Sequence, residues 1–243
     1  MTSPAKPDFG RLAPVYDQLR PADASWWELF DVVVRAGDLR GRRVLDAGGG
    51  TGVFAAALAE QALCRVWLVD PSAEMLEQAR ARVPATVGLK LGSAESLPFK
   101  DRWFERAVAR CSVHLWERPR AFAEVRRVAD RFVVATFDPV HFAGFWLNRF
   151  FPSIEQVDRK RFPDGPTLEG ELREAGFGEV RLLSLSQHRE ISREDALRKI
   201  EGRHISTFDL LDEEEVREGT ERARRDLPER ISQTQEWLLA VAG

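Results

Sequence analysis

The sequence has little cysteine, no long apolar run and little net charge, and each shortage excludes a class of protein. Cys64 and Cys111 are its only cysteines, too few for a disulfide framework or a thiolate metal cluster, so we expect a reducing cytoplasmic location and no metal. No segment is apolar over the length that a bilayer requires, and the N-terminal MTSPAKPDFG has no apolar signal core. The net charge of −3 provides no basic field, which makes nucleic acid and membrane unexpected partners.

Short apolar segments alternate with amphipathic ones along the first part of the chain. Apolar residues at helical spacing predict a helix over 26–36, which Gly37 ends. The next predicted strands are 43–47, 65–70, 87–91, 104–111 and 131–137, with helices over 51–61, 73–82 and 119–129 between them. Such alternation predicts parallel βαβ units and therefore an α/β fold with a doubly wound, mostly parallel sheet.

The alternation ends after Asp138. Further strands are predicted at 180–187 and 234–241, which gives seven in all, with a helix from Thr167 to Gly176 before them. The charged segment between these strands is helical in pattern, so we expect it to interrupt a strand pair, whereas the Pro-rich residues 1–14 should hold little regular structure. We expect a single domain over 1–243, divided into N-terminal cap helices (1–40), a ligand-binding core (42–139) and two insertions (140–166 and 190–230).

A glycine-rich segment from Asp46 to Gly52 joins the first predicted strand to the next helix. Glycine allows tight turns and close approach of a ligand to the backbone, and parallel α/β sheets bind ligands at the carboxyl ends of their strands. Asp70 ends the second predicted strand, where a carboxylate can accept both hydroxyl hydrogens of a ribose. Residues 50–55 also fit the dinucleotide pattern G-x-G-x-x-A, but the Asp46 carboxylate would repel a pyrophosphate and suits a cationic amino acid group.

Three segments taken together resemble the class I S-adenosylmethionine-dependent methyltransferases, particularly the type 11 group of small-molecule enzymes. These are VLDAGGGTG (44–52), LVDPSAEML (68–76) and GSAESLPF (92–99), and FGRLAPVYD (9–17) resembles the leading helix of the same enzymes. The resemblance covers about residues 9–140. It implies a Rossmann-like methyltransferase fold, S-adenosylmethionine as cofactor, S-adenosylhomocysteine as product and a small-molecule acceptor.

The same resemblance implies a set of cofactor-binding residues. Asp46 and Gly48 would lie near the methionine portion, with Tyr16 covering that end, and Asp70 would hold the ribose hydroxyls. Gly50 and Gly52 would shape the loop, while Pro71, Met75, Ala94 and Glu95 would surround the adenine; Ser93 and Arg110 complete the set. The sequence departs from the family at Ser93, where an acidic residue is usual, and at Glu105, where aspartate commonly precedes the fourth strand. A hydroxyl at Ser93 accepts a hydrogen bond more weakly than a carboxylate does.

The acceptor side of the site is less specified by the sequence. His114 follows the fourth predicted strand and is a candidate general base, with a structural histidine as the alternative. Cys111 is expected to be a small buried filler rather than a nucleophile. Candidate substrate residues are Trp116, Trp146, Arg203 and His204. The aromatics Phe145, Trp146 and Phe150 could form a pocket wall or a packed core, and Arg203 could bind an anionic substrate or form an ion pair.

Two other functions remain as alternatives at this stage. An RNA or protein methyltransferase would need a basic or extended docking face, and residues 110–113 lack the [DN]-P-P-[YF] stretch of enzymes that methylate base amino groups. A non-catalytic or NAD-type nucleotide-binding protein would share the glycine loop. In the leading hypothesis, the two insertions form a lid with the helix around Tyr16 and enclose methyl donor and acceptor. The oligomeric state is not specified by the sequence.

Overall fold

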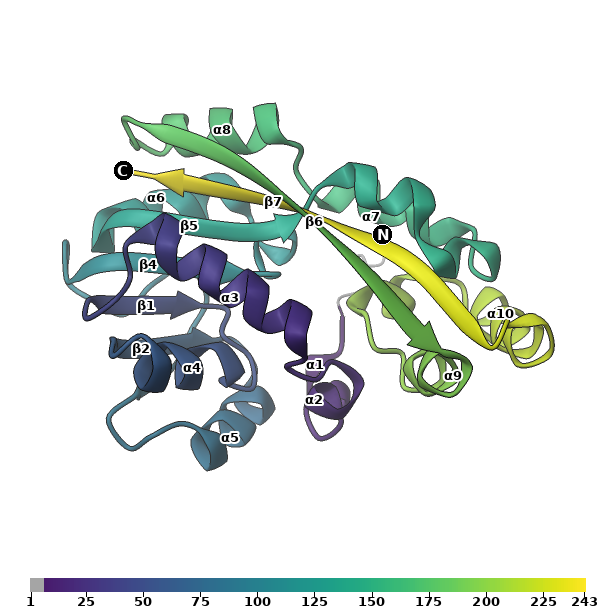
Figure 1. Cartoon of the computed structure of the whole chain (residues 1–243). Helices are drawn as coiled ribbons and strands as arrows, with labels where there is room; N and C mark the ends of the chain where they lie inside the picture. The colour runs from purple at the N-terminus through teal and green to yellow at the C-terminus, as the bar shows by residue number, and fades with distance from the viewer. Residues whose placement is uncertain (1–6) are drawn as a thin grey trace, which may run out of the picture.

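The computed structural model describes residues 7–243, so residues 1–6 of the Pro-rich segment lie outside the described residues. Its centre is one seven-stranded sheet of order β3-β2-β1-β4-β5-β7-β6 (Figure 1). Strands β1 to β5 run parallel, whereas β7 is antiparallel to both β5 and β6. The strands are β1 (Arg43–Ala47), β2 (Arg65–Asp70), β3 (Gly88–Leu91), β4 (Phe104–Arg110), β5 (Ala129–Phe137), β6 (Val180–Ser192) and β7 (Arg230–Ala242). The predicted doubly wound, mostly parallel sheet is confirmed.

Helices cover both faces of this sheet. The α-helices are α1 (Phe9–Leu12), α2 (Tyr16–Leu19), α3 (Ala24–Gly37), α4 (Val53–Gln61), α5 (Ala73–Arg82), α6 (Arg118–Val128), α7 (Ser153–Arg161), α8 (Gly165–Glu174), α9 (Arg193–Glu201) and α10 (Glu213–Asp226). The short 3₁₀ helices are η1 (Val113–Leu115), η2 (Pro139–Gly144), η3 (Trp146–Arg149) and η4 (Ser206–Leu210). Helices α3 and α4 share one core with the sheet, and α6 and α8 share another with its opposite face.

Local sequence explains where the helices beside the site begin. The Asp23 carboxylate accepts a hydrogen bond from the Trp26 amide at the start of α3, and the Ser72 hydroxyl accepts one from the Met75 amide at the start of α5. Within α3, apolar residues at i, i+3, i+4, i+7 and i+8 are buried; they are Trp26, Leu29, Phe30, Val33 and Val34. These caps fix the ends of α3 and α5 close to the carboxyl edge of the sheet.

The last two strands are longer than the sequence pattern predicts. Pairing of β6 with β7 extends from Val180↔Ala242 to Ser192↔Arg230, although β5 pairs with β7 only as far as Trp237. The predicted helical segment over 190–230 is therefore helical between 193 and 226 only, with η4 in its middle. Residues 187–192 and 230–235 alternate in burial like a strand but are mostly polar, which hides the alternation in a charged segment. The free end forms a two-stranded ribbon that leaves the sheet (Figure 1).

The two insertions share a core that is separate from the sheet. Its buried residues are Leu147, Phe150, Phe151, Ile154, Ile191, Ala196, Ile200, Phe208, Leu211, Val216, Ala223, Leu227 and Ile231. They come from η3 and α7 on one side and from the ribbon, α9, η4 and α10 on the other. Figure 1 shows this helical layer at the end of the ribbon, away from the sheet. The insertions therefore pack as one unit rather than as two separate decorations.

The N-terminal helices connect the sheet domain to this unit. Leu12 and Ala13 pack on Met75 of α5, whereas Arg11 forms an ion pair with Asp209 of η4 at 2.9 Å. The expectation of little regular structure over 1–14 is wrong for Phe9–Leu12, which form α1 between α5 and η4. The chain between residues 7 and 20 thus lies across the space between α5 and η4.

Candidate active site

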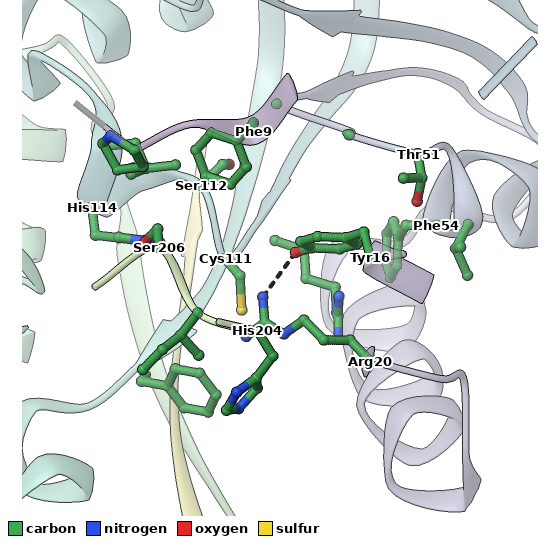
Figure 2. A pocket seen from close by; sticks show the side chains of 18 of the residues that line it. Phe9, Tyr16, Arg20, Thr51, Phe54, Cys111, Ser112, His114, His204 and Ser206 are labelled. Carbon is green, nitrogen blue, oxygen red and sulfur yellow. Dashed lines mark hydrogen bonds between the residues drawn. The ribbon is translucent and has the colours of Figure 1, made fainter. Parts of the chain in front are cut away.

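A cavity of about 570 Å³ lies at the carboxyl ends of β1, β2 and β4. The loop from Asp46 to Thr51, the end of β2 and the end of β4 form its floor. Residues of α2, the β6–β7 ribbon and η4 close it from the other side, and Figure 2 shows Tyr16 and Ser112 facing the same space from opposite elements. The cavity thus collects residues from the sheet, the N-terminal helices and both insertions.

Glycine is required where the floor approaches β2 and β4. Gly48 has φ +71°, and a Cβ there would lie 2.7 Å from the Ser112 Cβ; a Cβ on Gly49 would lie 2.5 Å from the Leu68 Cγ. Gly50 has φ +55° and also lines the cavity. Gly52 precedes α4 with φ +79° and packs against α5 instead, so it shapes the turn and lies outside the cavity lining. It is the one predicted cofactor-binding residue that does not line the cavity.

Asp70 ends β2 with its carboxylate held by the backbone around it. One oxygen accepts from the Gly50 amide and the other from the Ser72 amide, both at 2.9 Å. Burial raises the pKa of Asp70, and the hydrogen bonds from Ser72 and Gly50 oppose that rise. The two bonds fix the carboxylate at the cavity wall, where its remaining lone pairs can accept hydrogen bonds from vicinal hydroxyls.

Asp46 is the most buried acid of the cavity lining and has an unused oxygen. The residue is 1 % exposed, and its Oδ2 has no hydrogen-bond partner among residues 7–243. Burial, with a smaller contribution from the negative charge of Asp70, raises the pKa of Asp46 to about 7, whereas the Arg110 guanidinium lowers it. A buried acceptor without a donor is costly in an empty protein, so this oxygen indicates a ligand that brings a donor or a cation.

The predicted adenine-side residues line one end of the cavity. They are Pro71, Met75, Ser93, Ala94 and Glu95. The Glu95 carboxylate accepts from the Glu117 amide at 3.0 Å, which ties this wall to the start of α6. Arg110 lies at the other end, with its guanidinium over the Trp26 and Trp237 rings.

Several N-terminal residues line this cavity, among them Tyr16, Asp17 and Arg20, and of these three the sequence analysis assigned a role only to Tyr16. The Tyr16 hydroxyl accepts from Arg20 at 2.8 Å, as the dashed line in Figure 2 shows. The Asp17 carboxylate accepts from the Thr51 hydroxyl at 2.7 Å and forms an ion pair with Arg82 at 2.6 Å. These contacts hold α2 against the glycine loop. Their only signal in the sequence is the YD pair at positions 16–17.

His114 lines the cavity beyond the end of β4. Its ring stacks on Phe162 with a centroid separation of 4.0 Å, and its Nδ1 is buried without a hydrogen-bond partner among the described residues. Burial is the main cause that lowers the pKa of His114 well below its ordinary value; the nearby cations, Arg161 first, add to it. The imidazole is therefore neutral near pH 7, with a ring nitrogen available to a ligand.

The structure separates the four predicted substrate residues. Trp116, Trp146 and His204 line the cavity, and the Nδ1 of His204 is hydrogen-bonded to the Lys199 carbonyl at 3.0 Å. Arg203 does not line the cavity, because its guanidinium forms a two-point ion pair with Glu213. Arg203 thus forms the ion pair that the sequence analysis gave as its alternative role, and it is not part of the cavity lining.

The aromatic segment divides between the two roles considered from the sequence. Phe145 and Trp146 line the cavity, together with Phe142 of the same segment. Phe150 is 2 % exposed and belongs to the shared core of the insertions, so the expectation that it forms a pocket wall is wrong.

Neither a metal centre nor a membrane span is found in the part of the chain that the structure describes. No group of three or more His, Cys, Asp or Glu side chains over residues 7–243 is arranged to hold a metal ion. Within the same range, every helix is too short or too polar to cross a bilayer.

Comparisons with known proteins agree with this geometry. A family described as a methyltransferase domain matches residues 44–131, which carry the glycine loop and Asp70. The ubiquinone/menaquinone biosynthesis C-methyltransferase of Bordetella parapertussis is 31 % identical over 187 residues, which cover 66 % of this chain and 72 % of that protein. The chain therefore belongs to the class I S-adenosylmethionine-dependent methyltransferases.

Other relatives extend beyond the matched region. The chloroplastic 2-methyl-6-phytyl-1,4-hydroquinone methyltransferase 2 of rice is 34 % identical over 178 residues, which cover 70 % of this chain and 49 % of that protein. The chain thus spans about half the length of this relative. Among solved structures, the YcgJ protein of Bacillus subtilis has a TM-score of 0.61 at 22 % identity, covering 89 % of this chain and 97 % of that one. The [4+2]-cyclase SpnF has a TM-score of 0.63 at 19 % identity, covering 98 % and 97 %. These structures establish the fold alone.

Proposed function

We propose that the protein transfers a methyl group from S-adenosylmethionine to a small organic acceptor. The observation that supports this most directly is the unused, buried Asp46 oxygen next to the glycine loop, because it fits a cationic amino acid group. A Cβ on Gly48 or Gly49 would clash with Ser112 or Leu68, so glycine at these positions keeps the loop close to the carboxyl ends of β2 and β4. An NAD-type ligand would place a pyrophosphate against the same carboxylate, which is unfavourable.

The chain's residues divide the binding of such a cofactor between them. Asp70 would accept from the ribose hydroxyls, and Asp46 would face the ammonium group. Pro71, Met75, Ala94 and Glu95 would enclose the adenine, while Tyr16 would cover the methionine end. When bound, the cofactor supplies a methyl group on a sulfonium. The protein contributes mainly orientation of the two reactants and exclusion of water.

We assign to His114 the role of accepting a proton from an acceptor hydroxyl or similar group. Its neutral imidazole is on the acceptor side of the cavity, and its free Nδ1 can form the hydrogen bond that proton transfer requires. Stacking on Phe162 holds the ring in place. An acceptor that loses no proton at the transfer step would not need this group.

The enclosure of the cavity favours a small acceptor over RNA or protein. The insertion unit and α2 cover the sheet edge, so a macromolecule would reach the methyl group only if this cover opened. We infer that segments 140–166 and 190–230 are the substrate-side part of the site and act with the Tyr16 helix as a lid. The Bordetella relative is named for C-methylation in ubiquinone and menaquinone biosynthesis, and the rice relative for methylation of a phytyl hydroquinone, so both names point to small organic acceptors.

Asp46 gives cofactor binding a defined pH dependence. Because an ammonium group favours the ionised carboxylate, affinity for S-adenosylhomocysteine should fall about tenfold between pH 8 and pH 6, around the Asp46 pKa of about 7. For folding without a ligand, the raised pKa of Asp46 gives the opposite pH dependence. The Asp46 carboxyl contributes to the free energy of unfolding below about pH 4, and this contribution is lost as pH rises through about 7. Calorimetric titrations at several pH values should show the fall in the wild type and a flat profile in Asp46→Asn. An equal change of affinity with pH in both proteins would show that Asp46 does not contact the ligand.

A labelled methyl-transfer assay tests the proposed function. Purified protein is incubated with methyl-labelled S-adenosylmethionine and a cell extract that has been separated by ultrafiltration into small metabolites and macromolecules. We expect label in the small-molecule fraction, and its loss with Asp70→Ala. Label found only in RNA or protein would contradict the small-acceptor proposal.

A further inference from the structure

Two cations that the N-terminal segment and α9 bring to the cavity, Arg20 and Lys199, have no acidic partner among the described residues. Arg110, at the end of β4, is a third cavity cation without an ion pair among these residues and lies over the Trp26 and Trp237 rings. The Arg20 guanidinium donates to the Tyr16 hydroxyl at 2.8 Å, and the Lys199 ammonium donates to the Leu19 carbonyl. Neither side chain forms an ion pair within residues 7–243, and residues 1–6 contain no acidic side chain. Both cations line the cavity, although Arg20, which follows α2, and Lys199 of α9 are about 180 residues apart in the sequence.

The surrounding charges do not neutralise this pair. Arg189 is paired with Asp23, and Arg161 with Asp158, so these two carboxylates of the cavity lining already have their own cations. Arg20 and Lys199 are therefore two positive charges in excess at the acceptor end of the cavity. Such an excess is unfavourable in a partly buried site unless an anion completes it.

Neighbouring titrations show the same positive potential. Burial, followed by the charges of Arg20 and Arg189, lowers the pKa of Lys199 to about 8. The pKa of His204 is lowered well below its ordinary value by burial and then by Lys199 and Arg20. Lys199 of α9, His204 of the loop after it and Arg20 after α2 thus experience one common field, and an anion placed among them would favour the charged forms of Lys199 and His204.

The other residues that line this end of the cavity are aromatic or carry an unused acceptor. Figure 2 shows the Arg20 side chain between Tyr16 and His204 and near Cys111. Phe137, Phe142 and Phe145 line the cavity beyond it, and aromatic walls suit a flat apolar body. The Gln233 Oε1 is buried there without a partner among the described residues. The site offers an apolar slot, a pair of cations and one unused acceptor.

We propose that the methyl acceptor carries a negatively charged oxygen group, such as a carboxylate, which Arg20 and Lys199 hold while its aromatic or otherwise planar body lies against the phenylalanine wall. The two cations are specificity-determining residues, and the same field excludes amine acceptors that carry a positive charge. This inference rests on the proposed function, because it names the substrate class of the same site.

Three isosteric probes test the proposal: 2-naphthoate, its neutral amide 2-naphthamide, and the cationic 2-(aminomethyl)naphthalene. Each is titrated by calorimetry into wild-type protein saturated with S-adenosylhomocysteine. Because a charge-assisted pair contributes more than a neutral hydrogen bond, 2-naphthoate should bind at least about tenfold more tightly than the amide, and the amine should not bind. Failure of 2-naphthoate to bind, or equal Kd values for the acid and the amide, would overturn the proposal.

Two variants test whether Lys199 and Arg20 cause the preference for 2-naphthoate over 2-naphthamide. In Lys199→Met and Arg20→Gln, the Kd of 2-naphthoate should rise about tenfold while that of 2-naphthamide stays unchanged. Lys160→Met, on the exposed side of α7, is the matched control and should retain the wild-type ratio. Circular dichroism and the affinity for S-adenosylhomocysteine check that each variant is folded. If Arg20→Gln disturbs Tyr16, Lys199→Met alone tests the preference for the acid. An acid-to-amide ratio that neither variant changes would also overturn the proposal. If S-adenosylhomocysteine itself does not bind, the proposed function fails instead.

Discussion

Replacing Asp70 with alanine should weaken the binding of S-adenosylhomocysteine about 10- to 150-fold. A charged acceptor that serves two hydroxyls contributes about 1.5–3 kcal/mol, and this carboxylate is held in place by two backbone amides before any ligand arrives. Preorganisation of this kind means that no further ordering is needed on binding. Calorimetric titration of the wild type and the variant at one pH measures the change directly.

Asp70→Asn and Asp31→Ala provide the controls for this measurement. The asparagine keeps one acceptor oxygen but loses the charge, so its affinity should lie between those of the wild type and the alanine variant. Asp31 is exposed on α3 and should leave the affinity unchanged. An unaltered Kd in a folded Asp70→Ala protein would remove Asp70 from the cofactor site.

Replacing Gly219 with alanine should destabilise the protein by about 1–2 kcal/mol, although the same change in a helix ordinarily stabilises by about 0.5–1 kcal/mol. Gly219 lies within α10, where an added Cβ would be 2.3 Å from the Phe151 Cε1 and 2.6 Å from the Phe150 carbonyl oxygen. Phe151 is fully buried in the shared core of the insertions and has no room to move aside. The steric cost should therefore exceed the gain in helix propensity.

Gly170→Ala is the matched control for Gly219→Ala. Gly170 also lies within a helix, α8, but an added Cβ there has no neighbour within 4 Å. Its free energy of unfolding in a denaturant titration should rise by about 0.5–1 kcal/mol, because only the propensity term acts. If both variants gain stability, α10 does not pack on Phe151 as the structure describes.

The cofactor half of the site was predictable because its signals are local. Asp46, the glycines and Asp70 lie within 25 residues, and each stands at the end of an apolar strand that determines where it is placed. Ser72 is only two residues after Asp70 in the sequence, so the cap of α5 and the carboxylate come from one short segment. The sequence pattern therefore located most of this half before any tertiary contact was known.

The acceptor half was not predictable because its contacts are distant in the sequence. Arg20 and Lys199 belong to the same wall only because the β6–β7 ribbon brings α9 back over α2. Arg203 shows the converse case, since a cation beside His204 resembles a ligand site until Glu213 is brought next to it. The ribbon was itself hidden, because its outer residues are mostly polar and its buried face carries only Ile191 and Ile231 as apolar residues, too few for the apolar alternation that marks a strand.

The most direct test of the central claim is a calorimetric comparison of S-adenosylhomocysteine with NAD on the wild-type protein. The geometry of Asp46, Gly48 and Asp70 predicts that S-adenosylhomocysteine binds with one-to-one stoichiometry and that NAD produces no binding heat, because its pyrophosphate would face a buried carboxylate. Saturable binding of NAD together with no binding of S-adenosylhomocysteine would contradict the assignment of this cavity to a methyl-donor cofactor.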